Sequence, residues 1–377
     1  MKIISIVGAR PNFMKIAPFC KALQKYPDVK HILVHTGQHY DVRMSDSFFT
    51  DLDIPAPDVH LNIGSGSHAE QVGRTMIEFE KVVKAEKPDW IVVVGDVNAT
   101  CACSIVAKKE HIKLAHIEAG LRSGDIDMPE EVNRLVTDRL ADLLLTPDRI
   151  SNANLKAEGV DDKKIAFVGN IMIDTLETQR AKAEVRNIPE LVQRELLESR
   201  TIPELPENGF AVMTMHRPSN VDQEETLRPL IDFLTEEVAK DMPLLWPIHP
   251  RAKKQLELFG LWEKVKKHVI LLNPLGYHDM LRLNMGAKLM LTDSGGLQEE
   301  CCVLGTPCLT LRWNTERPVT LREHGGASML VGNNVERIRN AYQEVLRSQR
   351  TPQRPELWDG HTAERIAETL MQYDLTK

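Results

Sequence analysis

The sequence predicts an α/β protein with two doubly wound, Rossmann-like domains that face a cleft. Three observations lead to this prediction. The chain has 377 residues, more than a single hydrophobic core usually supports. Short apolar runs alternate with amphipathic helical stretches along the whole chain, which is the pattern of parallel sheets covered by helices on both faces. The alternation is interrupted once, where a charged helical stretch at 175–199 is followed by Pro203, Pro206 and Gly209.

Strands are expected at the apolar, β-rich runs on either side of that interruption. Before it they lie at 2–7, 31–35, 90–94, 114–117, 143–146 and 165–168, and after it at 210–215, 244–248, 269–272, 288–291, 308–311 and 328–331. Helices are expected between them, for example at 69–84 and 132–141. The first domain should therefore end near Gly169, and the second should run from 170 to about 360. A last helix, at about 361–377, has Ile366, Leu370 and Tyr373 on one face and could pack on either domain.

Charge and composition exclude several classes of protein. The net charge of −7 argues against nucleic acid or an anionic membrane surface as the partner, so a polyanionic ligand would have to meet a local basic pocket. No apolar run approaches the roughly 18 residues that span a bilayer. The first apolar run has only about five residues, too short for the core of a secretion signal, so a cytoplasmic location is expected.

The six cysteines do not predict a metal site or a disulfide framework. Cys101 and Cys103 lie on one expected helix, and Cys301 and Cys302 lie on another. No pair of cysteines, and no set of cysteines and histidines, has the spacing of zinc ligands. We therefore expect buried structural thiols, because free cysteine behaves as a small hydrophobic residue.

One strand end has the features of a phosphate-binding loop. In an open parallel sheet the ligand lies beyond the carboxyl ends of the strands. The strand at 288–291 runs into Asp293-Ser294-Gly295-Gly296 and then into a helix. The glycines let the backbone approach a ligand, and the start of the helix offers free N–H groups and a positive dipole end to a phosphate. A tight turn with a helix cap is the structural alternative.

Cationic or imidazole side chains follow other strands in both halves. They are Arg10 and Lys15 in the first half, and His216, Arg217 and Arg317 in the second. An arginine can bind two phosphate oxygens at once. A surface ion pair would explain any one of these residues, but their repetition at strand ends predicts a pyrophosphate between the domains.

Acidic residues gather at the strand ends of the first half. Asp96 and Glu118 each follow a strand closely, and Glu130 lies a loop later, just before an expected helix. Carboxylates held close together repel one another and retain protons near neutral pH, which suits general acid/base catalysis. Taken singly, each carboxylate could be a helix cap or a solvated loop charge.

A divalent metal is the competing use of this cluster. Asp96, Glu118 and His116 could be its ligands, although the favoured prediction is that no metal is bound. Two further histidines at strand ends, His39 and His249, are expected to be hydrogen-bonding partners rather than catalysts.

Taken together, these segments resemble the non-hydrolysing UDP-N-acetylglucosamine 2-epimerases. The matching segments follow the family order along most of the chain, up to about residue 320. They are GARPNFMKIAP, TGQHY, VVVGDVNAT, HIEAGLRSGD, PEEVNR, MHRPSN, LTDSGGLQEE and NTERPVT. The resemblance implies the two-domain GT-B fold, a final helix that returns to the first domain, a homodimer, and a UDP-sugar substrate with no cofactor.

The resemblance also implies roles for individual residues. The acid/base carboxylates are Asp96, Glu118 and Glu130, and His216 supports departure and return of the diphosphate. Arg10, Ser294, Gly295 and Gly296 hold phosphate, Glu300 holds the ribose, and Lys15, Arg134 and Arg317 line the sugar-diphosphate pocket. The implied reaction removes the proton on carbon 2 as UDP departs, leaves a glycal, and adds UDP back with protonation from the opposite face.

Other functions stay open on sequence alone. One related enzyme would epimerise a UDP-linked diacetamido uronic acid, and a hydrolysing one would release N-acetylmannosamine and UDP. A glycosyltransferase fits the fold but makes poor use of three clustered carboxylates, and a non-catalytic sensor of nucleotide sugars would not need them. The carboxylates therefore favour an epimerase over these last two functions, and the resemblance implies UDP-N-acetylglucosamine as the substrate.

A regulatory site is the one place where the sequence departs from the family. Many bacterial members bind a second UDP-N-acetylglucosamine beside the active site. The positions of that effector site match at four residues, which are Gln38, Glu131, Arg217 and His249. A family glutamine is replaced by Asp41, and a family arginine is missing near Gly66. Both changes predict weaker binding of an anionic effector.

Overall fold

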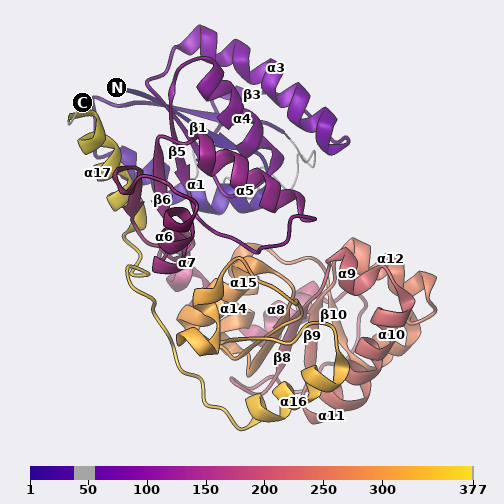
Figure 1. Ribbon diagram of the computed structural model, residues 1–377. Coiled ribbons are helices and arrows are strands. Elements are labelled where there is room, and N and C mark those ends of the chain that lie inside the picture. Colours follow the sequence, from indigo (N-terminus) through magenta and orange to yellow (C-terminus); the bar gives the residue numbers. More distant parts are fainter. Residues whose placement is uncertain (38–55, 376–377) are drawn as a thin grey trace. The chain divides into compact units, whose positions relative to one another are not determined.

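The computed structural model describes residues 1–37 and 56–375, and the chain forms two compact α/β units (Figure 1). Unit 1 contains Met1–Thr175 together with Glu356–Lys377, and unit 2 contains Leu176–Pro355. The C-terminal segment therefore belongs to unit 1, and the chain passes between the units at Thr175 and again at Glu356.

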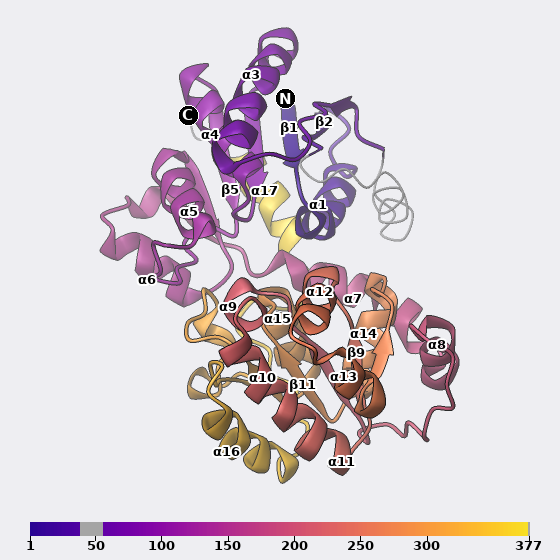
Figure 2. The ribbon, with the colours of Figure 1, turned by 90° about the vertical axis from the view of Figure 1, so that its right-hand side faces the viewer.

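Unit 1 is built on a parallel sheet with strand order β3-β2-β1-β4-β5-β6-β7. Its strands are β1 (Lys2–Val7), β2 (Lys30–His35), β3 (Val59–His60), β4 (Trp90–Val94), β5 (Lys113–Ile117), β6 (Leu143–Thr146) and β7 (Ile165–Phe167). The helices are α1 (Arg10–Leu23), α3 (His68–Glu86), α4 (Asn98–Lys109), α5 (Pro129–Leu140), α6 (Arg149–Ala157), the start of α7 (Ile171–Glu184) and α17 (Thr362–Leu375). Figure 2 shows this unit from a second direction, with α17 beside α1. The two-residue strand β3 was not predicted, because its run is too short to carry a pattern.

Unit 2 has a second parallel sheet with the order β10-β9-β8-β11-β12-β13. Its strands are β8 (Ala211–Thr214), β9 (Leu244–Pro247), β10 (Ile270–Leu272), β11 (Leu289–Thr292), β12 (Cys308–Thr310) and β13 (Ser328–Leu330). The helices are α8 (Ile188–Glu195), α9 (Pro218–Val221), α10 (Glu224–Phe233), α11 (Ala239–Asp241), α12 (Pro250–Leu258), α13 (Trp262–His268), α14 (Tyr277–Gly286), α15 (Gly295–Leu304) and α16 (Val335–Leu346).

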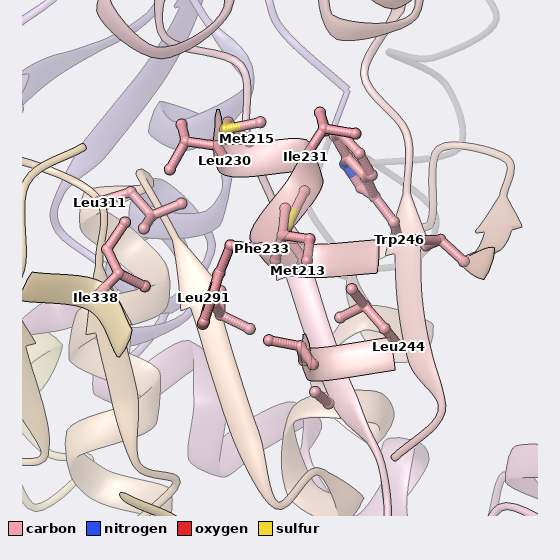
Figure 3. Close-up of a cluster of buried hydrophobic side chains, with 14 of the residues drawn as sticks. Met213, Met215, Leu230, Ile231, Phe233, Leu244, Trp246, Leu291, Leu311 and Ile338 are labelled. Carbon is pink, nitrogen blue, oxygen red and sulfur yellow. The ribbon is translucent and has the colours of Figure 1, made fainter. Parts of the chain in front are cut away.

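Alternate residues of the unit 2 strands fill two separate cores. Met213, Trp246 and Leu291 point to one face, where they pack against α10 and α16 (Figure 3). Their strand neighbours Val212 and Met290 point to the other face and pack against α8, α14 and α15. Both faces of the sheet are therefore buried, which explains why these strands read as unbroken apolar runs.

The charged stretch at 175–199 forms two helices rather than one. Asn187 caps the second of them, α8, with its side chain accepting the N–H of Glu190, and Pro189 lies in the first turn. Both are signals for the start of a helix, so the break could have been predicted. The six cysteines are free and buried, as expected. Within the described residues, no helix is long and apolar enough to cross a membrane.

Each sheet has one point at which the chain order reverses. In unit 1 this switch point lies between β1 and β4, and in unit 2 it lies between β8 and β11. Ligands of open α/β sheets bind beyond the carboxyl ends of the strands at such points. The residues after β1, β4, β8 and β11 are therefore the first candidates for a site.

Candidate active site

The turn after β4 carries Asp96 at the switch point of unit 1. Gly95 has a φ of +69°, and a Cβ atom at this position would lie 3.3 Å from Nζ of Lys15. Glycine is needed here both for the backbone conformation and for the space. The turn is held from another element by Asn133 of α5, whose Nδ2 donates to the carbonyl of Asp96 at 2.8 Å.

Arg134 links two carboxylates at this turn. Its Nη1 pairs with Oδ2 of Asp96, and its Nε and Nη2 donate to Oε2 of Glu131 at 2.9 and 2.6 Å. Glu131 also accepts the backbone N–H groups of Ser123 and Gly124. Burial alone would raise the pKa of Glu131, but these N–H groups and Arg134 outweigh it and hold the pKa below its ordinary value. Glu131 is therefore an anion that fixes Arg134.

Glu118 follows β5 in a strained backbone conformation. Its φ of +71° is unusual for a residue with a side chain, and such strain is typical of functional positions. The Glu118 carboxylate pairs with Nζ of Lys15 from α1, and both side chains are buried. The β5 strand ends at Ile117, so the alternation of strand faces does not extend to Glu118.

The predicted acidic cluster needs one correction. Asp96 pairs with Arg134, and Glu118 pairs with Lys15. The strand ends therefore carry ion pairs rather than a cluster of carboxylates alone. Glu130 lies exposed in the first turn of α5, where a carboxylate suits the helix dipole. The backbone thus brings the three predicted carboxylates to the ends of β4 and β5 and the start of α5.

His116 does not take part in a metal site. Its Nδ1 lies 2.6 Å from Oδ1 of Asp138, and its Nε2 lies 2.8 Å from the carbonyl oxygen of Gly95. Both ring nitrogens are therefore engaged, and the ring is fully buried. Among the residues that the structure describes, no group of three or more His, Cys, Asp or Glu side chains could hold a metal ion.

The switch point of unit 2 holds a pair formed by His216 and Asp293. Nδ1 of His216 lies 2.8 Å from Oδ1 of Asp293. Oδ2 of Asp293 accepts the backbone N–H groups of His216 and Arg217 and the Nδ2 of Asn220. Asp293 is completely buried, and burial alone would raise its pKa, but the His216 ring and the N–H donors keep the pKa below its usual range. The His216 side chain itself is 43% exposed, so it can reach a ligand.

The loop after Asp293 leads into α15 and lies against Arg317. Gly295 is the first residue of α15, and a Cβ atom there would lie 2.7 Å from Nη1 of Arg317. The guanidinium of Arg317 forms ion pairs with Glu316 and with Glu299, the latter at 2.8 Å from Nε. The free N–H groups of the helix start make a favourable place for an anion, beside a guanidinium whose charge is already shared with two carboxylates. An added Cβ atom at Gly296 would meet nothing within 4 Å, so the backbone there is open to approach.

Glu300 lies on α15 and is buried in the interior of unit 2. Burial raises the pKa of Glu300 to about 7, against the lowering effects of Tyr277 and Asn284. Tyr277 and Asn284 are the hydrogen-bonding side chains beside this carboxyl group. A neutral carboxyl group at this place can both donate and accept hydrogen bonds, which suits hydroxyl groups of a ligand.

Some residues of the predicted phosphate and effector sites lie wholly or partly outside the described residues, and others lie away from the strand-end carboxylates. The backbone of Arg10 begins α1, but its side chain is outside the described part, as are Gln38, His39 and Asp41. His249 caps α12 by accepting the N–H of Arg251, and its ring centroid lies 5.5 Å from that of His216. At Gly66, near which the resemblance implies a lost arginine, an added Cβ atom would lie 2.3 Å from Nη2 of Arg74 of α3.

Comparison with known proteins decides the family. A model of the UDP-N-acetylglucosamine 2-epimerase family matches residues 21–371. The chain belongs to the UDP-N-acetylglucosamine 2-epimerase family. The resemblance of the eight motifs to this family is thereby confirmed, and membership places the protein among the epimerases.

Relatives of this epimerase share most of its length. It is 42% identical over 374 residues to the UDP-N-acetylglucosamine 2-epimerase of Methanocaldococcus jannaschii, covering 98% of this chain and 99% of that protein. It is also 40% identical over 338 residues to the UDP-2,3-diacetamido-2,3-dideoxy-D-glucuronate 2-epimerase of Pseudomonas aeruginosa, covering 88% of each chain. Sequence identity alone therefore does not show which of these two sugars the protein acts on.

Solved structures establish the fold class of the epimerase. The crystal structure of the M. jannaschii UDP-GlcNAc 2-epimerase, in complex with UDP-GlcNAc and UDP, aligns with a TM-score of 0.88 at 40% identity, covering 99% of this chain and 100% of that one. A glycotransferase of kitacinnamycin aligns with a TM-score of 0.57 at 11% identity and shares the fold alone. The predicted GT-B class of two parallel-sheet domains is confirmed.

Residue patterns alone did not identify every residue that shapes the site. The motifs point to Asp293 only as part of a loop, and they give Asp138 and Glu316 no role in the site. Buried acidic residues next to a motif are the signal that would have pointed to them, because a buried charge needs a partner. Which partner it finds depends on the packing of distant segments.

Proposed function

We propose that this epimerase interconverts UDP-N-acetylglucosamine and UDP-N-acetylmannosamine without hydrolysis. Unit 1 supplies the groups that move the proton on carbon 2, and unit 2 holds the UDP. The single observation that carries the proposal is the pair of strand-end carboxylates, Asp96 and Glu118, each next to a cation at or beside a switch point. Proton abstraction beside an anomeric carbon needs such bases, whereas nucleotide binding alone does not.

The proposed reaction has two balanced steps. In the first, a carboxylate takes the proton from carbon 2, the electron pair of that C–H bond forms the double bond to carbon 1, and the bond from carbon 1 to the UDP oxygen breaks. In the second, a proton is added to carbon 2 from the opposite face while the UDP oxygen bonds to carbon 1 again. Two faces require two proton-transfer groups, and we assign them among Asp96, Glu118 and Glu130.

The departing diphosphate needs stabilisation at unit 2. We assign it to His216, to the start of α15 at Ser294–Gly296, and to Arg317, and Arg10 keeps the phosphate-binding role that the resemblance implies. Preorganised N–H groups and cations stabilise developing negative charge without reorganising during the reaction. Glu300 is assigned to the ribose hydroxyl groups because it is a buried carboxyl group on α15, the helix that follows the Ser294–Gly296 loop.

A neutral sugar suits the described residues better than a uronic acid. The carboxylate of a diacetamido uronic acid would need a cation of its own in the sugar site. Lys15 and Arg134 are buried and already paired with Glu118, Asp96 and Glu131. We therefore favour UDP-N-acetylglucosamine and keep the UDP-diacetamido uronic acid as the second candidate, since a relative of similar identity carries that name.

Proton NMR of the anomeric region tests the proposal. The purified protein is incubated with UDP-N-acetylglucosamine, and the anomeric signal of UDP-N-acetylmannosamine is expected to grow until the two sugars reach equilibrium. Release of free N-acetylmannosamine with UDP would instead show a hydrolysing enzyme. The same assay with the UDP-diacetamido uronic acid as substrate gives the comparison of kcat/KM that selects between the two sugars.

A further inference from the structure

Asp138 joins three elements that carry the proposed catalytic groups. It lies on α5 and is buried, with 3% of its surface exposed. One carboxylate oxygen, Oδ1, lies 2.6 Å from Nδ1 of His116. The other, Oδ2, accepts the backbone N–H of Gly120 at 3.0 Å and Nη1 of Arg122 at 2.7 Å.

These contacts reach every strand end at which a proposed carboxylate lies. Through His116, whose Nε2 lies 2.8 Å from the carbonyl of Gly95, Asp138 holds the turn that presents Asp96. Through Gly120 it holds the loop that follows Glu118, where the backbone is strained. Its own helix carries Glu130 and Arg134. One buried carboxylate thus fixes the relative positions of three short segments.

The partners of His116 determine how many protons its ring carries. A backbone carbonyl only accepts hydrogen bonds, so the Nε2 atom that faces Gly95 must donate. Asp138 is an anion, because its Oδ2 atom accepts hydrogen bonds from the Arg122 guanidinium and from the backbone N–H of Gly120. The Nδ1 atom therefore donates as well. A histidine that donates from both nitrogens is an imidazolium ion.

We propose that Asp138 and His116 are positioning residues for epimerisation, and that a buried His116 imidazolium clamps the Gly95–Asp96 turn to the loop after Glu118 and to α5. This inference rests on the proposed function for its kinetic consequences, but its structural part stands on the contacts alone. Neither residue touches the substrate. Their loss moves the carboxylates, and displacement of a catalytic group by about 1 Å costs roughly 100-fold in rate.

Two substitutions at His116 separate the two contacts of the ring. His116→Gln places an amide N–H near the position of Nε2 and keeps the donor to the Gly95 carbonyl. His116→Asn places an amide near the position of Nδ1 and keeps the hydrogen bond to Asp138. It loses the hydrogen bond to the Gly95 carbonyl that holds the Asp96 turn. We expect His116→Asn to lower kcat about 100-fold and to change KM by less than about threefold. The kcat of His116→Gln should be about 10-fold higher than that of His116→Asn.

The matched control is another buried aspartate of unit 1. Asp174 accepts the N–H groups of Thr362 and Ala363 at the start of α17 and belongs to no proposed site. Asp174→Asn measures how much kcat falls when a buried aspartate outside the site is substituted. A loss of kcat in His116→Asn no larger than in Asp174→Asn would overturn the proposal. Equal losses in His116→Asn and His116→Gln would overturn it too.

A spectroscopic measurement tests the clamp independently of activity. The protein is labelled with ¹⁵N-histidine, and the signals of His116 are identified by their absence in His116→Gln. We expect both ring nitrogens of His116 to show protonated shifts with slowly exchanging protons at pH 7.5. One unprotonated nitrogen would contradict the clamp. If the wild-type protein does not epimerise the sugar at all, the proposed function fails while this spectrum still decides the state of His116.

Discussion

The Oδ1 atom of Asp293 lies 2.8 Å from Nδ1 of His216, and the two residues follow neighbouring strands at the switch point of unit 2. The carboxylate is completely buried, whereas the imidazole is 43% exposed. A buried anion beside Nδ1 keeps the proton on that nitrogen and leaves Nε2 to face a ligand. The pair therefore has the arrangement needed to orient a histidine toward a leaving diphosphate.

Asp293→Asn should disable His216 without removing it. The asparagine oxygen can still accept the N–H groups of His216 and Arg217. Its NH2 group then faces Nδ1 and favours the tautomer of His216 that carries the proton on Nε2. We expect kcat to fall by about 100-fold or more, with UDP affinity changed much less, as when the aspartate that orients a catalytic histidine is replaced. Isothermal titration with UDP and initial rates of epimerisation measure both quantities. A kcat like that of the wild type would show that His216 does not need this partner.

The three carboxylates should be needed for turnover and not for UDP binding. Asp96→Asn, Glu118→Gln and Glu130→Gln are each expected to retain UDP affinity and to lose orders of magnitude in kcat, because they act on the sugar. Arg10→Ala serves as the contrasting variant and should weaken UDP binding itself. Titration with UDP separates the two groups. Carboxamide variants that no longer bind UDP would show that these carboxylates are structural.

The strand ends could be predicted from the sequence, but their partners could not. Asp96, Glu118 and Asp293 were located because apolar runs end directly before them, and the rule for open parallel sheets names those ends as the site. That Lys15 reaches Glu118, or that His116 reaches Gly95, depends on packing between segments far apart in the chain. The two-residue β3 is too short to carry a pattern, and the division of the charged stretch into α7 and α8 is marked in the sequence only by the cap at Asn187 and by Pro189.

Glu300→Gln should make the protein more stable at alkaline pH and a poorer binder of UDP. Burial raises the pKa of Glu300 from 4.5 to about 7, so its contribution to stability is present below pH 4.5 and is lost as the pH rises through 7. The glutamine does not ionise. We expect the variant to gain up to about 3 kcal/mol over the wild type between pH 4.5 and pH 8, since one pKa unit corresponds to about 1.4 kcal/mol.

Urea unfolding at the two pH values measures this gain, with Glu225→Gln on the exposed face of α10 as the control. The same variant should bind UDP about 10-fold or more weakly at pH 8 if Glu300 holds the ribose, because an ionised carboxylate accepts from two hydroxyl groups and the amide oxygen replaces only one of these acceptors. A stability difference that does not change with pH would contradict the assignment of a raised pKa. Unchanged UDP affinity would remove Glu300 from the ribose site.

The enzyme should epimerise pure UDP-N-acetylmannosamine without an activator. The resemblance implies that Asp41 places a negative charge where the family has a glutamine, and that an arginine lost near Gly66 removes a charge-assisted hydrogen bond of about 1.5–3 kcal/mol. Together they should weaken an anionic effector by about 100-fold or more. Progress curves recorded with and without a trace of UDP-N-acetylglucosamine provide the measurement, and Asp41→Gln is expected to increase any activation. A curve that stays flat until the trace is added would show that the effector is required.

Turnover in deuterated water tests the elimination mechanism most directly. If a carboxylate removes the proton on carbon 2 and a second group delivers a proton to the opposite face, the new hydrogen comes from a group that exchanges with solvent. We therefore predict that UDP-N-acetylmannosamine formed in deuterated water carries one deuterium, located on carbon 2, by mass spectrometry and proton NMR. Remaining UDP-N-acetylglucosamine should become labelled at the same carbon as equilibrium is approached. Epimerised product that carries no deuterium at carbon 2 would contradict the account.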